Sequence, residues 1–136
     1  MRKRNSELTE LPLFSDASRS ELATINQKLT RLTLPAGTVL VHEGEPGREF
    51  MVLVDGEAEV SQGGDVIAKV GRGDVVGEMA LLAESGQGLR NASVTALTKV
   101  EVYVGNRAEF RQLVTAVSSF AKKVRSTANA RTLVAA

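Results

Sequence analysis

Three residues in one short segment could together hold a small anionic ligand: Gly77, Glu78 and Arg90. A glycine lets the backbone approach a ligand closely, and the free amides that open a helical turn attract an anion. The Arg90 guanidinium could donate two parallel hydrogen bonds to the same anion. Glu78 would repel a phosphate but could accept a hydrogen bond from a hydroxyl group, for instance on a ribose. The segment therefore predicts a compact ligand with one phosphodiester and at least one hydroxyl.

The rest of the sequence offers little else for chemistry. The chain contains no Cys and a single His, His42, which excludes a thiolate nucleophile, a Cys-based metal site and a site with several His ligands. The GxxxxGK[ST] motif for a nucleoside triphosphate is absent from the sequence. We therefore expect a binding protein rather than an enzyme, with no metal and no cofactor. A structural ion pair between Glu78 and Arg90 is the alternative interpretation of the segment.

Length and composition favour one globular domain. The chain has 136 residues, of which 43% are hydrophobic and 24% charged, and a domain of this size can bury a self-sufficient core. No apolar stretch suited to a signal peptide follows the basic N-terminus. The longest apolar run, Phe50 to Val54, is far shorter than the ~20 residues that span a bilayer. We expect a cytoplasmic protein without a membrane span.

The net charge of +1 hides an uneven distribution along the chain. Residues 1–4 carry three basic groups and residues 106–136 carry a net charge of +5, so the part between them carries −7. An acidic middle argues against a nucleic-acid surface there. The residues after 105 are too few for a DNA-binding domain beyond a capping helix, so no direct DNA binding is expected.

Hydrophobic periodicity divides the chain into a helix, a run of strands and a second helical part. Ser18 and Glu21 form a capping box before the first helix. Asn106 and Glu109 form a similar start to a second helical part, whose apolar stripe runs to Val124. Between them, period-two segments alternate with turn signals, including a hairpin at 63–64. Short strands at this spacing predict a β-sandwich or barrel. The expected parts are an N-terminal helical segment (1–30), a β-barrel (31–105) that contains the segment 77–94, and C-terminal helices (106–136), all in one domain.

The order of these motifs resembles the cyclic nucleotide-binding domain family, which includes bacterial catabolite activators, protein kinase regulatory subunits and cyclic nucleotide-gated channels. Gly-Glu-x-Ala-Leu-Leu at 77–82, followed by Arg-x-Ala-Ser-Val at 90–94, is similar to the phosphate-binding cassette of that family. Matching residues precede the cassette at 34–37, 43–47, 50, 54–56, 71 and 73, and the likeness runs from about Leu11 to Phe120. It implies a mainly β fold, an eight-stranded jelly-roll-like barrel with an N-terminal helix and C-terminal helices.

The resemblance also implies a role for each part of the cassette. Arg90 would pair with the exocyclic phosphate oxygens, and Glu78 would bind the ribose 2′-hydroxyl. Main-chain amides near Gly77 would surround the phosphate, and a C-terminal helix over 116–130 would cap the base. The candidate ligand-binding residues are Gly77, Glu78, Met79, Ala80, Leu81, Arg90, Asn91, Ala92 and Ser93.

Two departures from the family pattern stand in the cassette. The connection from Glu78 to Arg90 is longer than usual, and Leu89 occupies a position where Pro is common. Asn91 follows the arginine, where cAMP binders often have Ala or Ser and cGMP binders Thr, so the choice of base stays open.

The resemblance implies a sensor or regulatory module that binds a cyclic nucleotide, with cAMP expected and cGMP as the alternative ligand. This module would act on an effector protein that the sequence does not identify. Two other interpretations are a degenerate domain that serves as a protein-interaction scaffold, and the regulatory domain of a larger effector.

Overall fold

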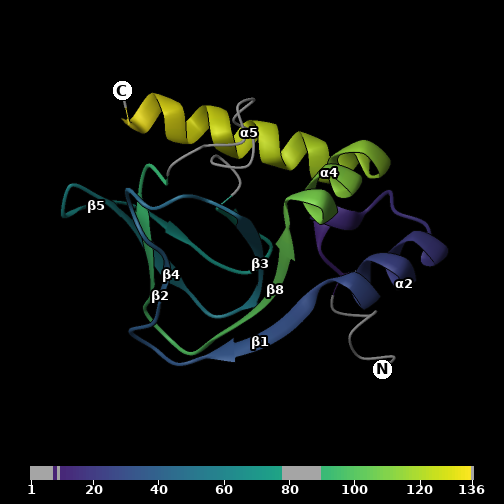
Figure 1. Cartoon of the computed structure of the whole chain (residues 1–136), viewed down its shortest axis with the longest axis horizontal. Helices are drawn as coiled ribbons and strands as arrows, with labels where there is room; N and C mark the ends of the chain where they lie inside the picture. Colours follow the sequence, from purple (N-terminus) through teal and green to yellow (C-terminus); the bar gives the residue numbers. More distant parts are fainter. Residues whose placement is uncertain (1–7, 9, 78–89, 136) are drawn as a thin grey trace.

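The chain forms a mainly β structure flanked by helices (Figure 1). The computed structural model describes residues 8, 10–77 and 90–135, with side chains up to residue 126. The elements follow in the order η1 (Pro12–Phe14), α2 (Arg19–Lys28), β1 (Thr30–Leu34), β2 (Val39–Val41), β3 (Glu49–Asp55), β4 (Ala58–Gln62), β5 (Asp65–Val70), β6 (Val75–Val76), β7 (Ser93–Ala96), β8 (Val100–Asn106), α4 (Arg107–Ala116) and α5 (Ser118–Ala135). Within this described part, no helix is long and apolar enough to cross a membrane.

The eight strands form two four-stranded antiparallel sheets, with the orders β1-β8-β3-β6 and β2-β7-β4-β5. Two packed sheets of eight strands in this arrangement make a double-sheet jelly roll. The expectation of a barrel is only partly correct, because the two sheets are not joined edge to edge among the described residues. One edge strand, β6, has only two residues and is followed by Gly77 at a φ of +83°, so it offers too short an edge to close the sheets.

Strand β3 belongs to two cores at once. Phe50, Val52 and Val54 point to the helices and join a core with η1, α2, α4 and α5. Met51 and Leu53 point to the other side and join the core between the two sheets. Because successive side chains alternate between the faces of a strand, a strand buried on both faces needs an uninterrupted apolar run. That requirement explains the run at 50–54.

The local signals that delimit the elements are confirmed. Ser18 Oγ accepts from the Glu21 amide at 3.1 Å while Glu21 Oε1 accepts from the Ser18 amide at 2.8 Å. Asn106 and Glu109 make the same reciprocal pair at the start of α4. The hairpin between β4 and β5 turns at two glycines with φ of +58° and +87°, which matches a turn that requires positive φ at both central residues.

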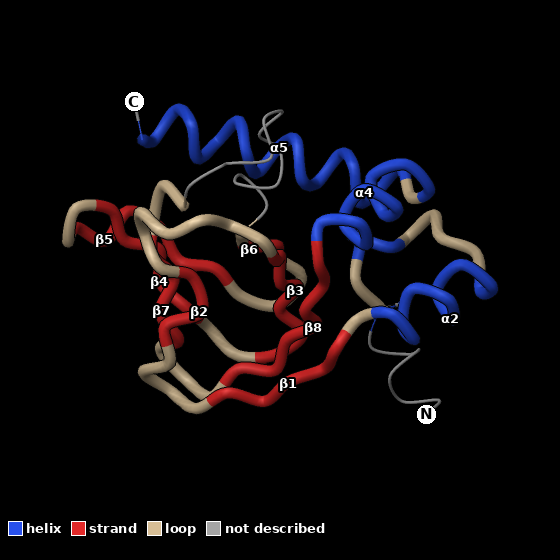
Figure 2. Tube along the Cα trace, viewed as in Figure 1, coloured by secondary structure: helices blue, strands red, loops and turns tan. Residues whose placement is uncertain are grey.

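All four phenylalanines of the chain meet in the helical core. The Phe120 ring, from α5, lies 5.9 Å from Phe14, 5.9 Å from Phe50 and 5.8 Å from Phe110, centroid to centroid. These partners come from η1, β3 and α4, so one aromatic side chain connects both ends of the chain to the middle of a sheet. The helices accordingly lie together at one side of the strands and above them (Figure 2).

The apolar stripe that starts after Asn106 is divided between two helices. α4 ends at Ala116, the next residue, Val117, has an extended backbone, and α5 begins at Ser118. The new helix start is capped from a distant part of the chain, because both carboxylate oxygens of Asp16 accept from the Ser119 amide, at 3.1 and 3.0 Å. Ser119 Oγ lies 2.7 Å from both Asp16 Oδ1 and the Leu13 carbonyl oxygen. The N-terminal segment thereby fixes where α5 begins.

Replacing Phe120 by Ala should destabilise the fold strongly, because the ring is fully buried and contacts three others. The expected loss in the free energy of unfolding is about 3–5 kcal/mol, measured by urea denaturation. Val66→Ala is the control, since that side chain is 59% exposed, and it should cost under about 1 kcal/mol. Similar losses for both variants would contradict the central role of the aromatic cluster.

The cap on α5 should make stability depend on acid pH. Hydrogen bonds from the Ser119 side chain, then from its amide, hold the pKa of Asp16 below its ordinary value of 3.8. A carboxylate with a lowered folded-state pKa stabilises the protein fully above its unfolded value, and this contribution disappears as pH falls through the folded pKa. The melting temperature of Asp16→Ala should therefore lie below that of wild type at neutral pH, and the gap should close only below about pH 3.8. A gap that persists unchanged in strong acid would show that the charge of Asp16 does not stabilise α5.

Candidate functional site

The described part of the predicted site surrounds the start of β7. Five of the nine candidates are described: Gly77 directly follows β6, and Arg90, Asn91, Ala92 and Ser93 lead into and begin β7. The other four, Glu78, Met79, Ala80 and Leu81, lie outside the described residues, as do the longer connection and Leu89. The prediction that Gly77 and Arg90 come together can therefore be compared directly with the structure.

The Arg90 side chain is held between the end of one strand and the beginning of another. Its Nη1 donates to the Gly77 carbonyl oxygen and its Nη2 to the Glu49 carbonyl oxygen, both at 2.8 Å. A guanidinium is planar with its donors in a fixed fork, so two such bonds set the orientation of the whole group. Both of these acceptors are uncharged carbonyl oxygens, and the guanidinium is half-buried.

Gly77 is required by two features of this contact. Its φ of +83° lies in the left-handed region, and a Cβ built there would lie 2.6 Å from Arg90 Nη1 and 2.9 Å from the Glu49 carbonyl oxygen. The sequence indicates a close backbone approach at this position, and the structure shows that the approaching group is the Arg90 guanidinium. The glycine therefore makes room for the arginine.

The main chain of Arg90 is paired with the connection between β2 and β3. The Arg90 amide donates to the Glu45 carbonyl oxygen at 2.7 Å, and the Gly44 amide donates to the Arg90 carbonyl oxygen at 2.8 Å. Sequence reasoning did not include Glu49 or this loop among the site residues. The stretch 43–47, which contains two glycines and a proline, could have indicated this loop. Hydrophobic periodicity alone identifies such a stretch only as a turn.

The three residues after Arg90 differ in their surroundings. Asn91 is exposed, and its carbonyl oxygen accepts from Gln62 Nε2 at 2.8 Å. Ala92 is half-buried and packs against the core between the sheets. Ser93 Oγ accepts from the Glu43 amide at 3.0 Å. The hydroxyl oxygen of Ser93 therefore has a structural partner within the protein.

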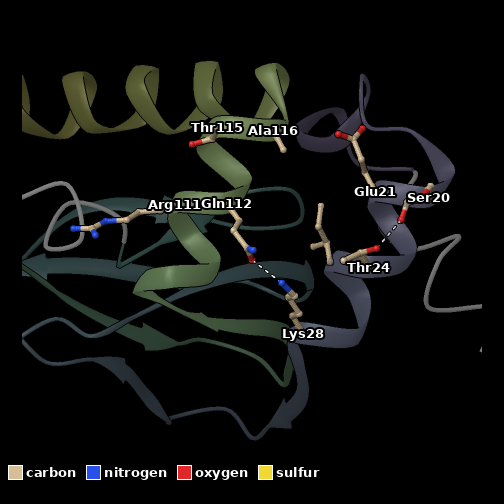
Figure 3. Close-up of a pocket in the computed structure, with 9 residues that line it drawn as sticks. Ser20, Glu21, Thr24, Lys28, Arg111, Gln112, Thr115 and Ala116 are labelled. Carbon is tan, nitrogen blue, oxygen red and sulfur yellow. Dashed lines mark hydrogen bonds between the residues drawn. The ribbon is translucent and has the colours of Figure 1, made fainter.

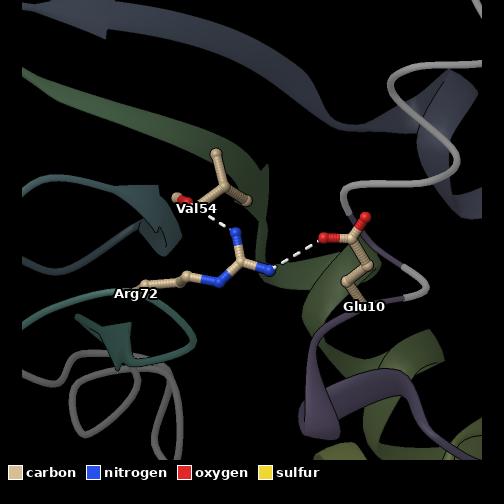
Figure 4. A network of polar contacts seen from close by, with 3 residues as sticks. All are labelled: Glu10, Val54 and Arg72. Carbon is tan, nitrogen blue, oxygen red and sulfur yellow. Dashed lines mark hydrogen bonds and ion pairs between the residues drawn. The ribbon is translucent and has the colours of Figure 1, made fainter.

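The turn that precedes β6 is connected to both ends of the chain. The Gly71 amide donates to Asp74 Oδ2 at 2.8 Å, and Asp74 Oδ1 lies 3.3 Å from Lys123 Nζ on α5. Arg72 Nη2 lies 3.1 Å from Glu10 Oε1 while its Nη1 donates to the Val54 carbonyl oxygen at 3.4 Å (Figure 4). Exposed pairs of this kind contribute little to stability, but they show that α5 and the N-terminal segment both reach the turn that leads into β6.

One hollow lies away from the candidate site, and a second lies beside it. A groove of about 520 Å³ separates α2 from α4, and Lys28 Nζ donates to Gln112 Oε1 across it at 3.0 Å (Figure 3). None of its lining residues is a predicted site residue. A second hollow of about 390 Å³ is lined mainly by residues of β1, β3 and β8, including Glu49. The described residues contain no cluster of three or more side chains suited to a metal ion.

A known protein family matches this chain over more than half of its length. The family model for the cyclic nucleotide-binding domain matches residues 31–116. This span covers both sheets, α4 and the whole segment between Gly77 and Arg90. The chain belongs to the cyclic nucleotide-binding domain family.

The proteins similar to this cyclic nucleotide-binding domain include regulatory subunits of protein kinases. It is 32% identical over 110 residues to the cAMP-dependent protein kinase regulatory subunit of Schizosaccharomyces pombe, which covers 80% of this chain and 26% of that protein. Among solved structures, it is similar to a PKAR CBD2 bound to Sp-2Cl-cAMPS, with a TM-score of 0.80, 25% identity and coverage of 98% of this chain and 90% of that one. The regulatory domain of Toxoplasma gondii PKA with cAMP gives a TM-score of 0.70, 28% identity and coverage of 93% and 48%. The chain spans about a quarter of the length of the curated relatives it matches.

The close approach at Gly77 of this domain can be measured with two glycine variants. Gly37 has a similar φ of +88° but nothing within 4 Å of a Cβ built on it, so Gly37→Ala tests backbone strain alone. That strain costs about 1–3 kcal/mol for an ordinary residue. Gly77→Ala should lower the free energy of unfolding by more than Gly37→Ala, because it must also displace the Arg90 guanidinium. Equal losses would mean that Arg90 moves aside without cost.

Proposed function

We propose that this domain is a regulatory module that binds cAMP and that it has no catalytic activity of its own. The observation that carries the proposal is the Arg90 guanidinium, oriented by the carbonyls of Gly77 and Glu49 at the position of the family's phosphate-binding arginine. A half-buried cation in a fixed orientation suits the single negative charge of a cyclic phosphodiester. The names of the relatives support the ligand, since they are cAMP-dependent kinase regulatory subunits or domains crystallised with cAMP or an analogue.

The remaining cassette residues take complementary parts in this proposal. Glu78 accepts a hydrogen bond from the ribose 2′-hydroxyl, and main-chain amides near Gly77, Ala80 and Leu81 surround the phosphate. Ala92 contributes apolar surface, and Met79, Asn91 and Ser93 complete the pocket. The cassette at 77–94 lies within the β part (31–105), between an N-terminal helical segment (1–30) and C-terminal helices (106–136).

The signal is proposed to pass through α5 by a shift between populated conformations. The apolar stripe that was expected to cap the ligand packs inside the protein as far as Val124. Its side chains are buried beside η1 and β3: Val117, Phe120, Ala121 and Val124. The first half of α5 therefore acts as an anchor. The part that follows Val124 is the one that responds to the base, and in Figure 1 it extends across the strands towards β5.

The partners and setting follow from the same proposal. The effector is a protein, kinase-like as in the relatives, that senses the position of α5, and the module contacts no DNA directly. Its location is the cytoplasm, where cAMP is available as a signal. cGMP is the alternative ligand, and Asn91, which can both donate and accept hydrogen bonds, should reject neither purine strongly.

Isothermal titration with cAMP tests this function directly. Wild type should bind saturably, with cGMP weaker. Arg90→Ala should lose about 2–5 kcal/mol of binding free energy because the phosphate loses its counter-charge, and Glu78→Ala should lose about 1.5–3 kcal/mol with the hydrogen bond to the ribose. Arg19→Ala is the matched control, an exposed arginine on α2 far along the chain from the cassette, and should bind as wild type does.

The alternative of a protein-interaction scaffold predicts a different result from the same titration. A degenerate domain would give no heat of binding with either nucleotide, although it would unfold cooperatively. Undiminished binding by Arg90→Ala would contradict the assignment of the phosphate site while leaving the ligand itself in place.

A further inference from the structure

The segment that carries Arg90 meets two other parts of the chain at a junction of hydrogen bonds. The junction consists of Glu43 in the β2–β3 loop, Gln62 and Gly63 at the β4–β5 turn, and Asn91 and Ser93 before and at the start of β7. Glu43 takes part twice, since its amide donates to Ser93 Oγ at 3.0 Å and its Oε1 accepts from the Gly63 amide at 3.0 Å. In the third hydrogen bond of the junction, Gln62 Nε2 donates to the Asn91 carbonyl oxygen at 2.8 Å.

This junction spans an interruption in the pairing of β2 with β7. Regular pairing ends at Val41 opposite Val94, and main-chain bonds resume only at Gly44 with Arg90. Between these points the Ser93 hydroxyl accepts a bond from a main-chain amide, and the Glu43 carboxylate holds the same loop to the β4–β5 turn. Side chains thus bridge the gap immediately beside the arginine.

The position of the loop matters for the arginine because the loop pairs with the Arg90 main chain. Gly44 and Glu45 bond the carbonyl oxygen and amide of Arg90, and the same connection leads into Glu49, whose carbonyl oxygen holds Nη2. A displaced loop would move the Arg90 backbone and one of the two acceptors of its guanidinium together. Binding sites that are ordered before the ligand arrives avoid the entropy cost of ordering them on binding.

We propose that Glu43 is a positioning residue for the nucleotide site and does not touch the ligand. Its carboxylate holds the β2–β3 loop to the β4–β5 turn, and that loop pairs with the Arg90 main chain. The proposal rests on the cyclic nucleotide-binding function proposed above. It also assigns the Ser93 hydroxyl oxygen a role in this junction, in addition to any surface that Ser93 offers the ligand.

Three variants distinguish the effect of the Glu43 hydrogen bond on cAMP binding from the effect of its negative charge. Glu43→Ala removes the acceptor for the Gly63 amide, whereas Glu43→Gln keeps an acceptor oxygen and removes only the charge. Asp65→Ala is the control, because Asp65 is an exposed carboxylate on the β4–β5 hairpin, and its side chain makes no hydrogen bond with the residues that the structure describes. Loss of a negative charge near an anionic ligand would strengthen binding in all three, so only loss of the bond predicts weaker binding.

Titration with cAMP should show Glu43→Ala binding about three- to tenfold more weakly than wild type, the range expected for one exposed hydrogen bond. Glu43→Gln and Asp65→Ala should bind at least as tightly as wild type. In ligand-free protein, hydrogen exchange of the amides of residues 90–93 should be faster in Glu43→Ala alone. In an Arg90→Lys background, Glu43→Ala should have a smaller effect on binding, because the fork that it positions is gone.

The possible results distinguish this inference from the function on which it depends. Failure of wild type to bind either cyclic nucleotide overturns both. Binding by wild type with Glu43→Ala equal to Asp65→Ala overturns the positioning role and leaves the function standing. Weakening by Glu43→Gln as large as that by Glu43→Ala also overturns it, since the effect would then come from the charge.

Discussion

The packing of Phe120 against three other phenylalanines holds the helices and the sheets of this domain in one arrangement. Its ring lies within 5.9 Å of Phe14, Phe50 and Phe110, centroid to centroid, and these partners belong to elements from the beginning, the middle and the end of the chain. Aromatic pairs combine a large buried area with a preferred geometry, so the cluster sets both the strength and the angle of the contact between α5 and β3. The carboxylate of Asp16 adds a polar bond that fixes the start of α5 at the edge of the same cluster.

The candidate site and this aromatic cluster are connected through two adjacent residues of β3. Glu49 gives its carbonyl oxygen to the Arg90 guanidinium, and Phe50 packs on Phe110 and Phe120. A change in the hydrogen bonds of Arg90 therefore acts on Glu49. This residue is next to Phe50, whose ring packs on α4 and α5. Packed protein interiors transmit strain, and the connection is short because Glu49 and Phe50 are neighbours in the same strand.

Much of the fold could be predicted from local signals. Both capping boxes, the Gly63–Gly64 hairpin and the run at 50–54 depend on neighbours in sequence, and each forms as the residue types require. The expected jelly-roll-like barrel was only partly correct, because strand edges meet or fail to meet according to how far each strand extends in three dimensions. The apolar stripe also gave no indication that α4 and α5 are separate helices. The group that caps α5 is the Asp16 carboxylate, which lies 103 residues away in the sequence.

The sequence by itself indicated two features of the candidate site: a glycine at 77 that allows a close backbone approach, and an arginine at 90 whose side chain suits an anion. Only the tertiary structure decided what holds that arginine. Its partners are the carbonyls of Gly77 and Glu49 and the loop at Gly44 and Glu45. Main-chain groups are the same in every residue, so no residue type announces them, and they become ligands for a side chain only when the folded sheets bring them within 3 Å.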